Sequence, residues 1–143
     1  MEQIDKKTLV KKARQHLENG SIQEALRIYQ DILAIDPEYS QALHDLGMIQ
    51  FDAGNISEAI LLLKKTTQHD DKRPDFHNNL GTVLKASGDL AAAEKAFRKA
   101  LTLDRNLVPA LVNIGSLLIE RGRIPAALKA LKRAIELAPE NST

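Results

Sequence analysis

Several residue types are absent or scarce in this chain of 143 residues. It contains no cysteine, which excludes disulfides, thiolate metal ligands and a thiol nucleophile. It has no tryptophan and only 3% aromatic residues, so it offers few rings on which single-stranded nucleic acid could stack. Its apolar run at residues 59–63 is far shorter than the roughly 20 residues that a membrane-spanning helix needs. We therefore expect no membrane insertion.

Charge of one sign is also lacking, because 20 lysines and arginines face 19 aspartates and glutamates. A chain with a net charge of +1 exerts no long-range attraction on nucleic acid. Nucleic-acid binding through the basic residues 6–14 is therefore the least favoured hypothesis, and we expect none. Residues 1–12 are charged throughout and lack the apolar core of a secretory signal, which predicts a cytoplasmic protein.

The sequence repeats itself with a period of 34 residues, and such a period decides the fold class before any single motif does. Glycine recurs at Gly20, Gly54, Gly88 and Gly122, and alanine at Ala25, Ala59, Ala93 and Ala127. Larger side chains recur at Tyr29, Leu63, Phe97 and Leu131, and small ones at Ala13, Gly47, Gly81 and Gly115. This period divides the chain into four repeats at residues 6–39, 40–73, 74–107 and 108–141.

Each repeat is predicted to form two helices around a glycine turn, since apolar residues return at helical spacing on both sides of it. The residue after the glycine should cap the second helix: Ser21 with Glu24 and Asn55 with Glu58 have capping-box spacing, and Asp89 is a lone cap. Where the two helices cross closely, side chains must be small. We expect the pairs Gly47 and Ala59, Gly81 and Ala93, and Gly115 and Ala127 to face each other there.

This pattern resembles the tetratricopeptide repeat family, whose motif is Trp-x2-Leu-Gly-x2-Tyr, then Ala-x3-Phe, then Pro. The matching residues are Leu46-Gly47, Leu80-Gly81, Ile114-Gly115, Ala25-x3-Tyr29, Ala59-x3-Leu63, Ala93-x3-Phe97, Ala127-x3-Leu131, Pro37 and Pro139. The tryptophan position departs from the motif and holds Leu9, Leu43, His77 and Leu111. The resemblance implies an all-α fold: a right-handed solenoid of eight antiparallel helices that forms a single array over residues 1–143.

The resemblance also implies that the first helix of each repeat lines a concave groove for a peptide or protein. Carried over by repeat position, the candidate partner-binding residues are Lys7, Lys11, Arg14, His44, Asp45, Met48, Phe51, Asn78, Asn79, Thr82, Lys85, Val112, Asn113, Ser116 and Ile119. Val10, Leu17, Gln41, Asp75 and Pro109 share that face.

The composition of this face suggests what the partner is like. Lys7, Lys11 and Arg14 favour an acidic end over the first repeat, and Met48 and Phe51 favour an apolar side chain over the second. The alternative is that residues 6–14 are only the solvated face of an end helix.

Two subtypes of the family can be compared with this face. The carboxylate clamp that captures chaperone C-termini needs Lys and Asn where this chain has Val10 and Arg14, which disfavours that reading. The asparagine ladder of O-linked N-acetylglucosamine transferase is half present, at Asn79 and Asn113, where the other repeats have Lys11 and Asp45. These asparagines could hold a peptide backbone, or could only bond neighbouring turns or water.

Signals of catalysis are missing, since the chain has no phosphate-binding glycine loop, no nucleophile elbow and no His-Glu-x-x-His motif. His69, Asp70 and Asp71 are better explained as a solvated loop than as metal ligands. We therefore expect no enzyme, no cofactor and no metal.

The last predicted helix, residues 125–138, carries Leu128, Leu131, Ile135 and Leu137 with no capping helix after it. We expect this edge to be covered, either by self-association into a homo-oligomer or by the continuation of a longer protein. The leading prediction is a non-enzymatic scaffold that binds a peptide or protein in its groove. The alternative is an N-terminal recruiting or regulatory domain of a larger enzyme such as a glycosyltransferase.

Overall fold

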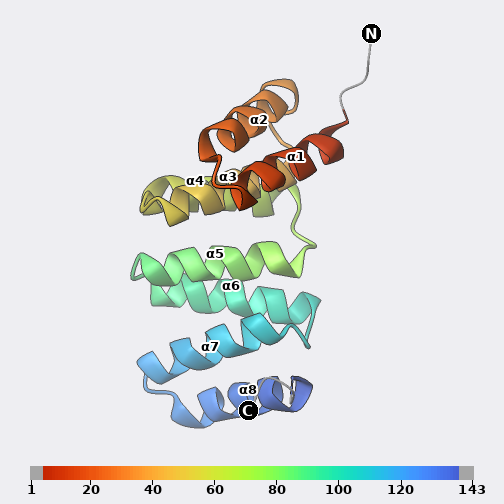
Figure 1. The fold of residues 1–143 in the computed structure, drawn as a ribbon. Helices are drawn as coiled ribbons and strands as arrows, with labels where there is room; N and C mark the ends of the chain where they lie inside the picture. The colour runs from red at the N-terminus through yellow and green to blue at the C-terminus, as the bar shows by residue number, and fades with distance from the viewer. Residues whose placement is uncertain (1–4, 139–143) are drawn as a thin grey trace. The chain divides into compact units, whose positions relative to one another are not determined.

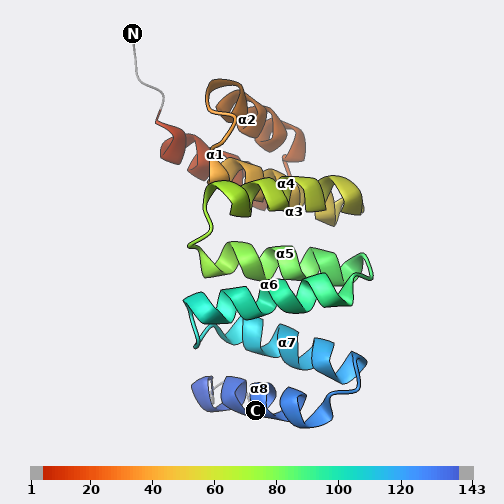
Figure 2. The same ribbon diagram turned by 180° about the vertical axis from the view of Figure 1, so that it is seen from behind.

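The structure, a computed structural model, describes residues 5–138. Over these residues the chain forms eight α-helices and no strand, as Figures 1 and 2 show from opposite sides. The helices are α1 (Lys6–Glu18), α2 (Ile22–Ile35), α3 (Ser40–Asp52), α4 (Ile56–His69), α5 (Pro74–Ala86), α6 (Leu90–Leu103), α7 (Val108–Glu120) and α8 (Ile124–Leu137). The prediction of an all-α solenoid of helix-turn-helix repeats is confirmed. None of the helices within residues 5–138 is both long and apolar enough to span a membrane.

The predicted glycine turns join the two helices of each repeat. Gly20, Gly54, Gly88 and Gly122 have φ angles of 79°, 86°, 90° and 75°, a region that only glycine enters at little cost. The residue after each glycine donates its backbone N–H to a carbonyl of the preceding helix, as Ser21 does to His16 at 2.8 Å. This bond satisfies a carbonyl that the end of the helix would otherwise leave unpaired.

The capping predictions are confirmed at one turn and wrong at two. Asp89 accepts a hydrogen bond from the backbone N–H of Ala92 at 3.1 Å, as expected for a cap. Ser21 and Asn55 make no side-chain cap bond. At Asn55 the reason is visible, because its side-chain amide donates instead to Gln50 Oε1 at 2.7 Å.

Inside the second, third and fourth repeats, a glycine on the first helix receives a large side chain from the second helix. A Cβ added at Gly81 would lie 2.5 Å from Phe97 Cε1, and one at Gly115 would lie 2.6 Å from Leu131 Cγ. The three atoms nearest to each added Cβ therefore belong to the large residue of the second helix. That these glycines also face Ala93 and Ala127 stays a prediction. The glycine lets the aromatic ring of Phe97 approach the backbone of α5.

The chain divides into two compact units, Met1–Asp70 and Asp71–Thr143. Unit 1 contains α1 to α4, with α2 packed on α3, and unit 2 contains α5 to α8, with α6 packed on α7. Each unit thus holds two of the predicted repeats. A single array over residues 1–143 stays a prediction, and the end of the last repeat, 139–141 with Pro139, lies outside the described residues.

Candidate partner-binding site

A buried carboxylate organises the face of unit 1 from which the candidate residues come. Asp45 on α3 is only 8% exposed, and Arg14 of α1 donates to both of its oxygens, from Nε at 2.9 Å and from Nη2 at 3.1 Å. The Tyr29 hydroxyl of α2 donates to Oδ2 at 2.7 Å. Gln41 Nε2 and His44 Nδ1 lie 2.9 and 3.0 Å from Oδ1. Asp45 therefore ties three helices of unit 1 together.

These neighbours decide the ionisation of the Asp45 network. Burial disfavours the charged carboxylate, but the hydrogen bonds from His44, Arg14 and Tyr29 outweigh it and hold the pKa of Asp45 well below its usual value. Burial, then the negative charge of Asp45, raises the pKa of Tyr29 above its usual value. Asp45 is thus ionised and Tyr29 neutral at neutral pH.

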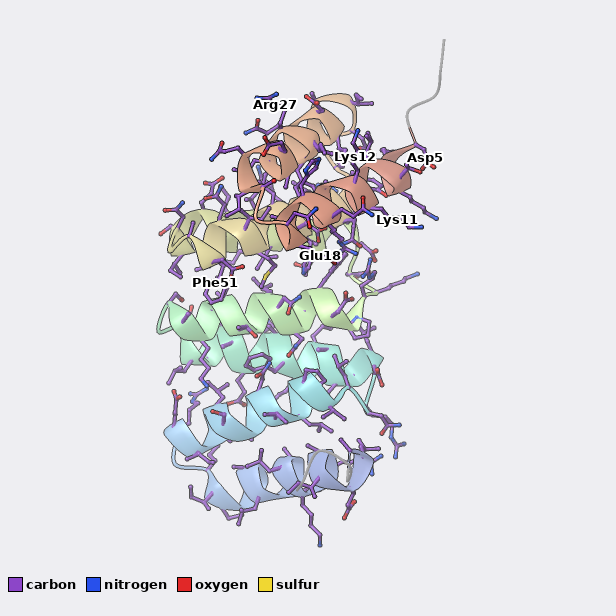
Figure 3. The ribbon with its side chains drawn as sticks, viewed as in Figure 1. Asp5, Lys11, Lys12, Glu18, Arg27 and Phe51 are labelled. Carbon is purple, nitrogen blue, oxygen red and sulfur yellow. The ribbon has the colours of Figure 1, made fainter. Side chains whose placement is uncertain are left out.

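Because of this network, the end of the face over the first repeat is less basic and less open than the sequence predicted. Asp45 and His44, both 8% exposed, lie in the interior and not on an open binding surface, because Asp45 draws its neighbours inward. Arg14 keeps an exposed edge, yet its charge is balanced by Asp45. Lys7 and Lys11 remain exposed on α1, and Figure 3 shows Lys11 extending from that helix.

The apolar candidates of unit 1 are less accessible than its lysines. Met48 and Phe51, both on α3, are partly buried. Figure 3 labels Phe51 near the C-terminal end of that helix.

On the corresponding face of unit 2, an amide takes the place of the Asp45 carboxylate. Asn113 Nδ2 on α7 donates to Asn78 Oδ1 on α5 at 3.0 Å and lies 3.4 Å from Thr82 Oγ1. Asn78 is buried and Asn79 is partly buried. The Asn113 amide thus makes a structural bond between adjacent repeats, one of the two uses that its position suggested.

Two exposed apolar side chains flank these polar contacts on α7. Val112 is 44% exposed and Ile119 is 48% exposed, and Ser116 lies between them on the same helix face. Lys85 of α5 reaches across to Ser116 Oγ at 3.1 Å and Glu120 Oε1 at 3.4 Å. We call this surface the inner face of unit 2. Its residues are Asn78, Thr82, Lys85, Val112, Asn113, Ser116 and Ile119.

The structure also reveals a charged cluster that sequence reasoning missed. Glu94 on α6 receives Arg98 Nε at 3.0 Å and the Nη1 atoms of Arg121 and Arg123, each at 3.1 Å. Burial disfavours the charged form, but the hydrogen bond from Arg98 and the charges of all three arginines keep the pKa of Glu94 below its usual value. The sequence contained a clue to this cluster, because the charged Glu94 occupies a repeat position where the other repeats have the apolar residues Leu26, Ile60 and Leu128.

The outer side of α8 is apolar and open in the described structure. Leu128 is 61% exposed, Ile135 is 60% exposed and Leu137 is 37% exposed. Leu131 is partly buried because it packs over Gly115, so this member of the predicted self-association edge belongs in part to the core.

No group of three or more His, Asp or Glu side chains within residues 5–138 is arranged to hold a metal ion. The class that emerges is a helical repeat protein whose exposed faces, and not an enclosed pocket of reactive groups, carry its candidate site. Two family models described as tetratricopeptide repeat match residues 16–80 and 75–140. The chain belongs to the tetratricopeptide repeat family.

Solved structures agree with this assignment. A crystal structure of MamA is similar with a TM-score of 0.84 and 22% identity, covering 96% of this chain and 81% of that one. A MamA fragment from Desulfovibrio magneticus RS-1 has a TM-score of 0.82 and 16% identity, covering 97% of this chain and 78% of that one. At such identities the likeness shows the fold alone. No curated protein matches the sequence significantly.

A third similar structure is a mutant O-GlcNAc transferase from Thermobaculum terrenum, with a TM-score of 0.79 and 29% identity. The match covers 90% of this chain but only 26% of the transferase. Tetratricopeptide repeats are in general non-catalytic modules for protein interaction, which makes the chain a protein-interaction scaffold in this broad sense.

Proposed function

We propose that this scaffold binds a peptide or protein segment on the inner face of unit 2. The observation that carries the proposal is the pair Val112 and Ile119, two apolar side chains that remain about half exposed beside a fixed polar network. Covering them removes apolar surface from water, at about 25 cal/mol per Å².

The polar network would fix the orientation of the bound peptide. Because Asn113 Nδ2 is held by Asn78 and Thr82, the Oδ1 atom of the same amide is fixed in orientation and can accept a peptide N–H. A preorganised acceptor loses little conformational entropy when the peptide arrives. The inner face therefore combines apolar affinity with a polar group that selects the register of the peptide.

On unit 1 we propose a contact through two lysines only. Lys7 and Lys11 are exposed and favour a segment with an acidic end, whereas Asp45 balances the charge of Arg14. Changing Lys7→Glu and Lys11→Glu together should weaken the binding of acidic peptides, and added salt should remove the difference.

A displayed library of random 12-residue peptides, selected on the wild-type chain, tests the inner face. We expect the Val112→Asp/Ile119→Asp variant to bind the selected peptides at least about tenfold more weakly, equal to 1.4 kcal/mol. The matched control, Ile35→Asp/Leu61→Asp, changes two side chains of unit 1 with similar exposure, 55% and 51%, and should bind like wild type. Unchanged binding by the inner-face variant, with unchanged helicity, would contradict the proposal.

A second candidate is a recruiting or regulatory domain of a larger enzyme such as a glycosyltransferase. The similarity to part of the O-GlcNAc transferase supports it. Of the ladder positions, Asp45 and the Nδ2 of Asn113 bond within the chain, so at Asn113 the ladder interpretation relies on the Oδ1 atom. The intact mass of the native protein decides, since a mass near 15.8 kDa contradicts the larger enzyme.

A further inference from the structure

Unit 2 has a recessed surface that is distinct from its inner face and lies over α7, between α6 and α8. It is a groove of about 360 Å³, and its floor consists of Leu111, Ile114 and Leu118 of α7, which are 6%, 4% and 3% exposed. Both α6 and α8 pack on α7 and lie on either side of it in Figures 1 and 2. The described residues that line the groove all belong to unit 2. We call it the α6–α8 groove.

The α6–α8 groove and the inner face of unit 2 lie on opposite sides of α7. A helix turns by about 100° per residue, so Val112, Ser116 and Ile119 point away from Leu111 and Leu118. The two surfaces share no residue. Binding in the groove is therefore separate from binding on the inner face.

Two alanines of α8 leave the space that forms the groove. Ala126 and Ala130 line it from the α8 side. In unit 1 the same repeat positions, two periods earlier, hold Glu58 and Leu62. Leu62 is 7% exposed, which shows that the packing of a repeat accommodates a leucine at this position. The groove therefore arises from the side chains of unit 2 and not from the repeat architecture alone.

The walls of the groove are cationic. Arg98 of α6 and Lys129 and Arg133 of α8 line it, and no carboxylate is among the described residues that do so. Arg133 is oriented by Asn106, because its Nη2 donates to Asn106 Oδ1 at 2.7 Å. At the three cationic positions unit 1 has Gln30, Leu61 and Lys65. Unit 2 therefore combines smaller side chains with greater positive charge at this place.

The arginine cluster beside the groove shows which group its side chains bind. Glu94 receives Arg98 Nε at 3.0 Å, and Arg121 and Arg123 each through Nη1 at 3.1 Å. One carboxylate thus faces three guanidinium groups, which leaves an excess of positive charge. Within residues 5–138 the Nη atoms of Arg98 have no hydrogen-bond acceptor. They are available to a second carboxylate, supplied by a partner.

These features fit an acidic segment that carries an apolar side chain. An apolar group over the leucine floor leaves water, while flanking carboxylates pair with the cations of the walls. Nucleic acid fits less well, because no aromatic ring is among the described lining residues to stack on a base. A membrane surface also fits less well, because the apolar floor is recessed between two helices, where a flat bilayer does not reach.

We propose that the α6–α8 groove binds an acidic segment of a partner protein. One apolar side chain of the segment lies over the α7 floor, and its carboxylates pair with Arg98, Lys129 and Arg133. The apolar anchor supplies affinity, and the charges select acidic partners and speed their association. This is a second binding site, independent of peptide binding on the inner face of unit 2.

NMR spectroscopy of the isotope-labelled full chain tests the groove with defined peptides. The probe peptide is a phenylalanine flanked on both sides by glutamates, and two matched peptides replace either the phenylalanine by serine or every glutamate by glutamine. The probe should shift the backbone amide signals of Arg98, Ala126 and Ala130 and bind at least about tenfold more tightly than either matched peptide. Equal binding of the probe and a matched peptide, or no shift at these amides, overturns the proposal.

Filling the groove tests its apolar part. Ala130→Leu introduces the side chain that unit 1 has at this repeat position, so helicity should be kept while the binding of the probe weakens by about tenfold. The control Ala91→Leu changes an exposed alanine of α6 that does not line the groove, and should bind like wild type. Unchanged binding by Ala130→Leu overturns the proposal.

Reversing charges tests the walls. Lys129→Glu/Arg133→Glu should weaken the binding of the probe by at least about tenfold at low salt, and added salt should reduce the difference. The control Arg105→Glu/Lys132→Glu makes the same change of net charge at residues that do not line the groove, and should weaken binding much less. Equal weakening by the two variants would mean attraction to the overall charge only, and overturns the groove assignment.

Two further outcomes would assign the binding to another surface or partner. The inner-face variant Val112→Asp/Ile119→Asp should bind the probe like wild type. If that variant loses the probe and Ala130→Leu keeps it, the groove proposal fails while the proposed function stands. Vesicles of phosphatidylglycerol should not bind. Vesicle binding that Lys129→Glu/Arg133→Glu abolishes, without binding of the probe, would make the groove a membrane contact and overturn the proposal.

Discussion

Units 1 and 2 share one plan of two helix pairs, yet they join their repeats with different polar groups. In unit 1 the bond between repeats is ionic: Arg14 and Asp45 meet on the first helices of the two repeats, with Asp45 buried. In unit 2 the equivalent position is neutral, with Asn113 donating to Asn78. The ion pairs between the repeats of unit 2 lie at other positions. Lys85 of α5 meets Glu120 of α7, and Glu94 of α6 meets Arg121 and Arg123.

This difference between the ionic and the amide contact shows that two units with the same arrangement of helices can present different surfaces to a partner. Asp45 and Asn113 occupy the same place in their repeats. The carboxylate draws Arg14 and Tyr29 onto itself, whereas the amide needs only a neighbouring amide and leaves Val112 and Ile119 exposed beside it. The group that joins the repeats therefore also decides whether the adjoining surface is filled or open.

The two units can be followed separately in solution. The chain has no tryptophan, and its two tyrosines, Tyr29 and Tyr39, both lie in unit 1. Tyrosine fluorescence therefore reports the unfolding of unit 1, while circular dichroism reports the helices of both units. Agreement or divergence of the two signals is the basis of the following predictions.

The largest effect is expected from Gly81→Ala in unit 2. The new methyl group would lie 2.5 Å from the fully buried ring of Phe97, and such overpacking should lower the free energy of unfolding by about 3 kcal/mol. Urea denaturation followed by circular dichroism measures it. In a Phe97→Ala background the same change should cost almost nothing, and an undiminished cost there would refute the steric explanation.

The second effect is expected from Asp45→Asn in unit 1. This change keeps the shape of the side chain but removes the charge that Arg14 and Tyr29 need, and should cost about 2 kcal/mol. Urea denaturation followed by tyrosine fluorescence should show the loss. Asp52→Asn, on the exposed end of the same helix, is the control and should change stability by less than about 0.5 kcal/mol. Equal effects of the two changes would mean that the buried network contributes little.

The third effect is a dependence on acid that Asp45 gives to unit 1. Its pKa is lower in the folded chain than in the unfolded chain, so its stabilisation is complete well above about pH 4 and is lost as the pH falls toward the folded pKa. One proton taken up on unfolding changes stability by at most about 1.4 kcal/mol per pH unit. Stability measured by tyrosine fluorescence from pH 5 downward should fall less steeply in Asp45→Asn than in wild type. Parallel curves would contradict this assignment.

The smallest effect is expected from Glu94→Gln in unit 2. Its partners Arg98 and Arg123 have half-exposed side chains, so water and salt screen the interaction, and the change should cost about 0.5 kcal/mol. Circular dichroism at low and high salt measures it, and high salt should reduce the difference. A cost as large as that of Asp45→Asn would contradict the expected contrast between Asp45, which is also bonded to the buried Tyr29 and His44, and Glu94, whose side-chain partners are arginines.

Much of the fold follows from periodicity in the sequence. The last helix was expected at residues 125–138 and is observed as α8, Ile124–Leu137, and all four turn glycines have the expected positive φ. These features depend on local spacing and backbone sterics, which a single sequence displays directly. The Ser21 cap shows the limit of this reasoning, because suitable spacing permits a hydrogen bond without requiring it.

The polar contacts between repeats could not be predicted in the same way. Arg14 and Asp45 are 31 residues apart, and Glu94 and Arg121 are 27 apart, so whether they meet depends on how one helix pair packs on the next. The positions lining the candidate faces were available from the repeat pattern. Which of them use their polar atoms internally became visible only once the packing was known.

The fit of small against large residues has a further consequence for how such a chain can change over generations. Gly47 with Leu63, Gly81 with Phe97 and Gly115 with Leu131 are pairs within one repeat, so duplicating a repeat copies both halves of its fit. The polar bonds cross from one repeat to the next and are not copied with their partner. Duplication can therefore lengthen this protein without damage to its core, while the bonds at each new junction must be selected afresh and record the order of the repeats.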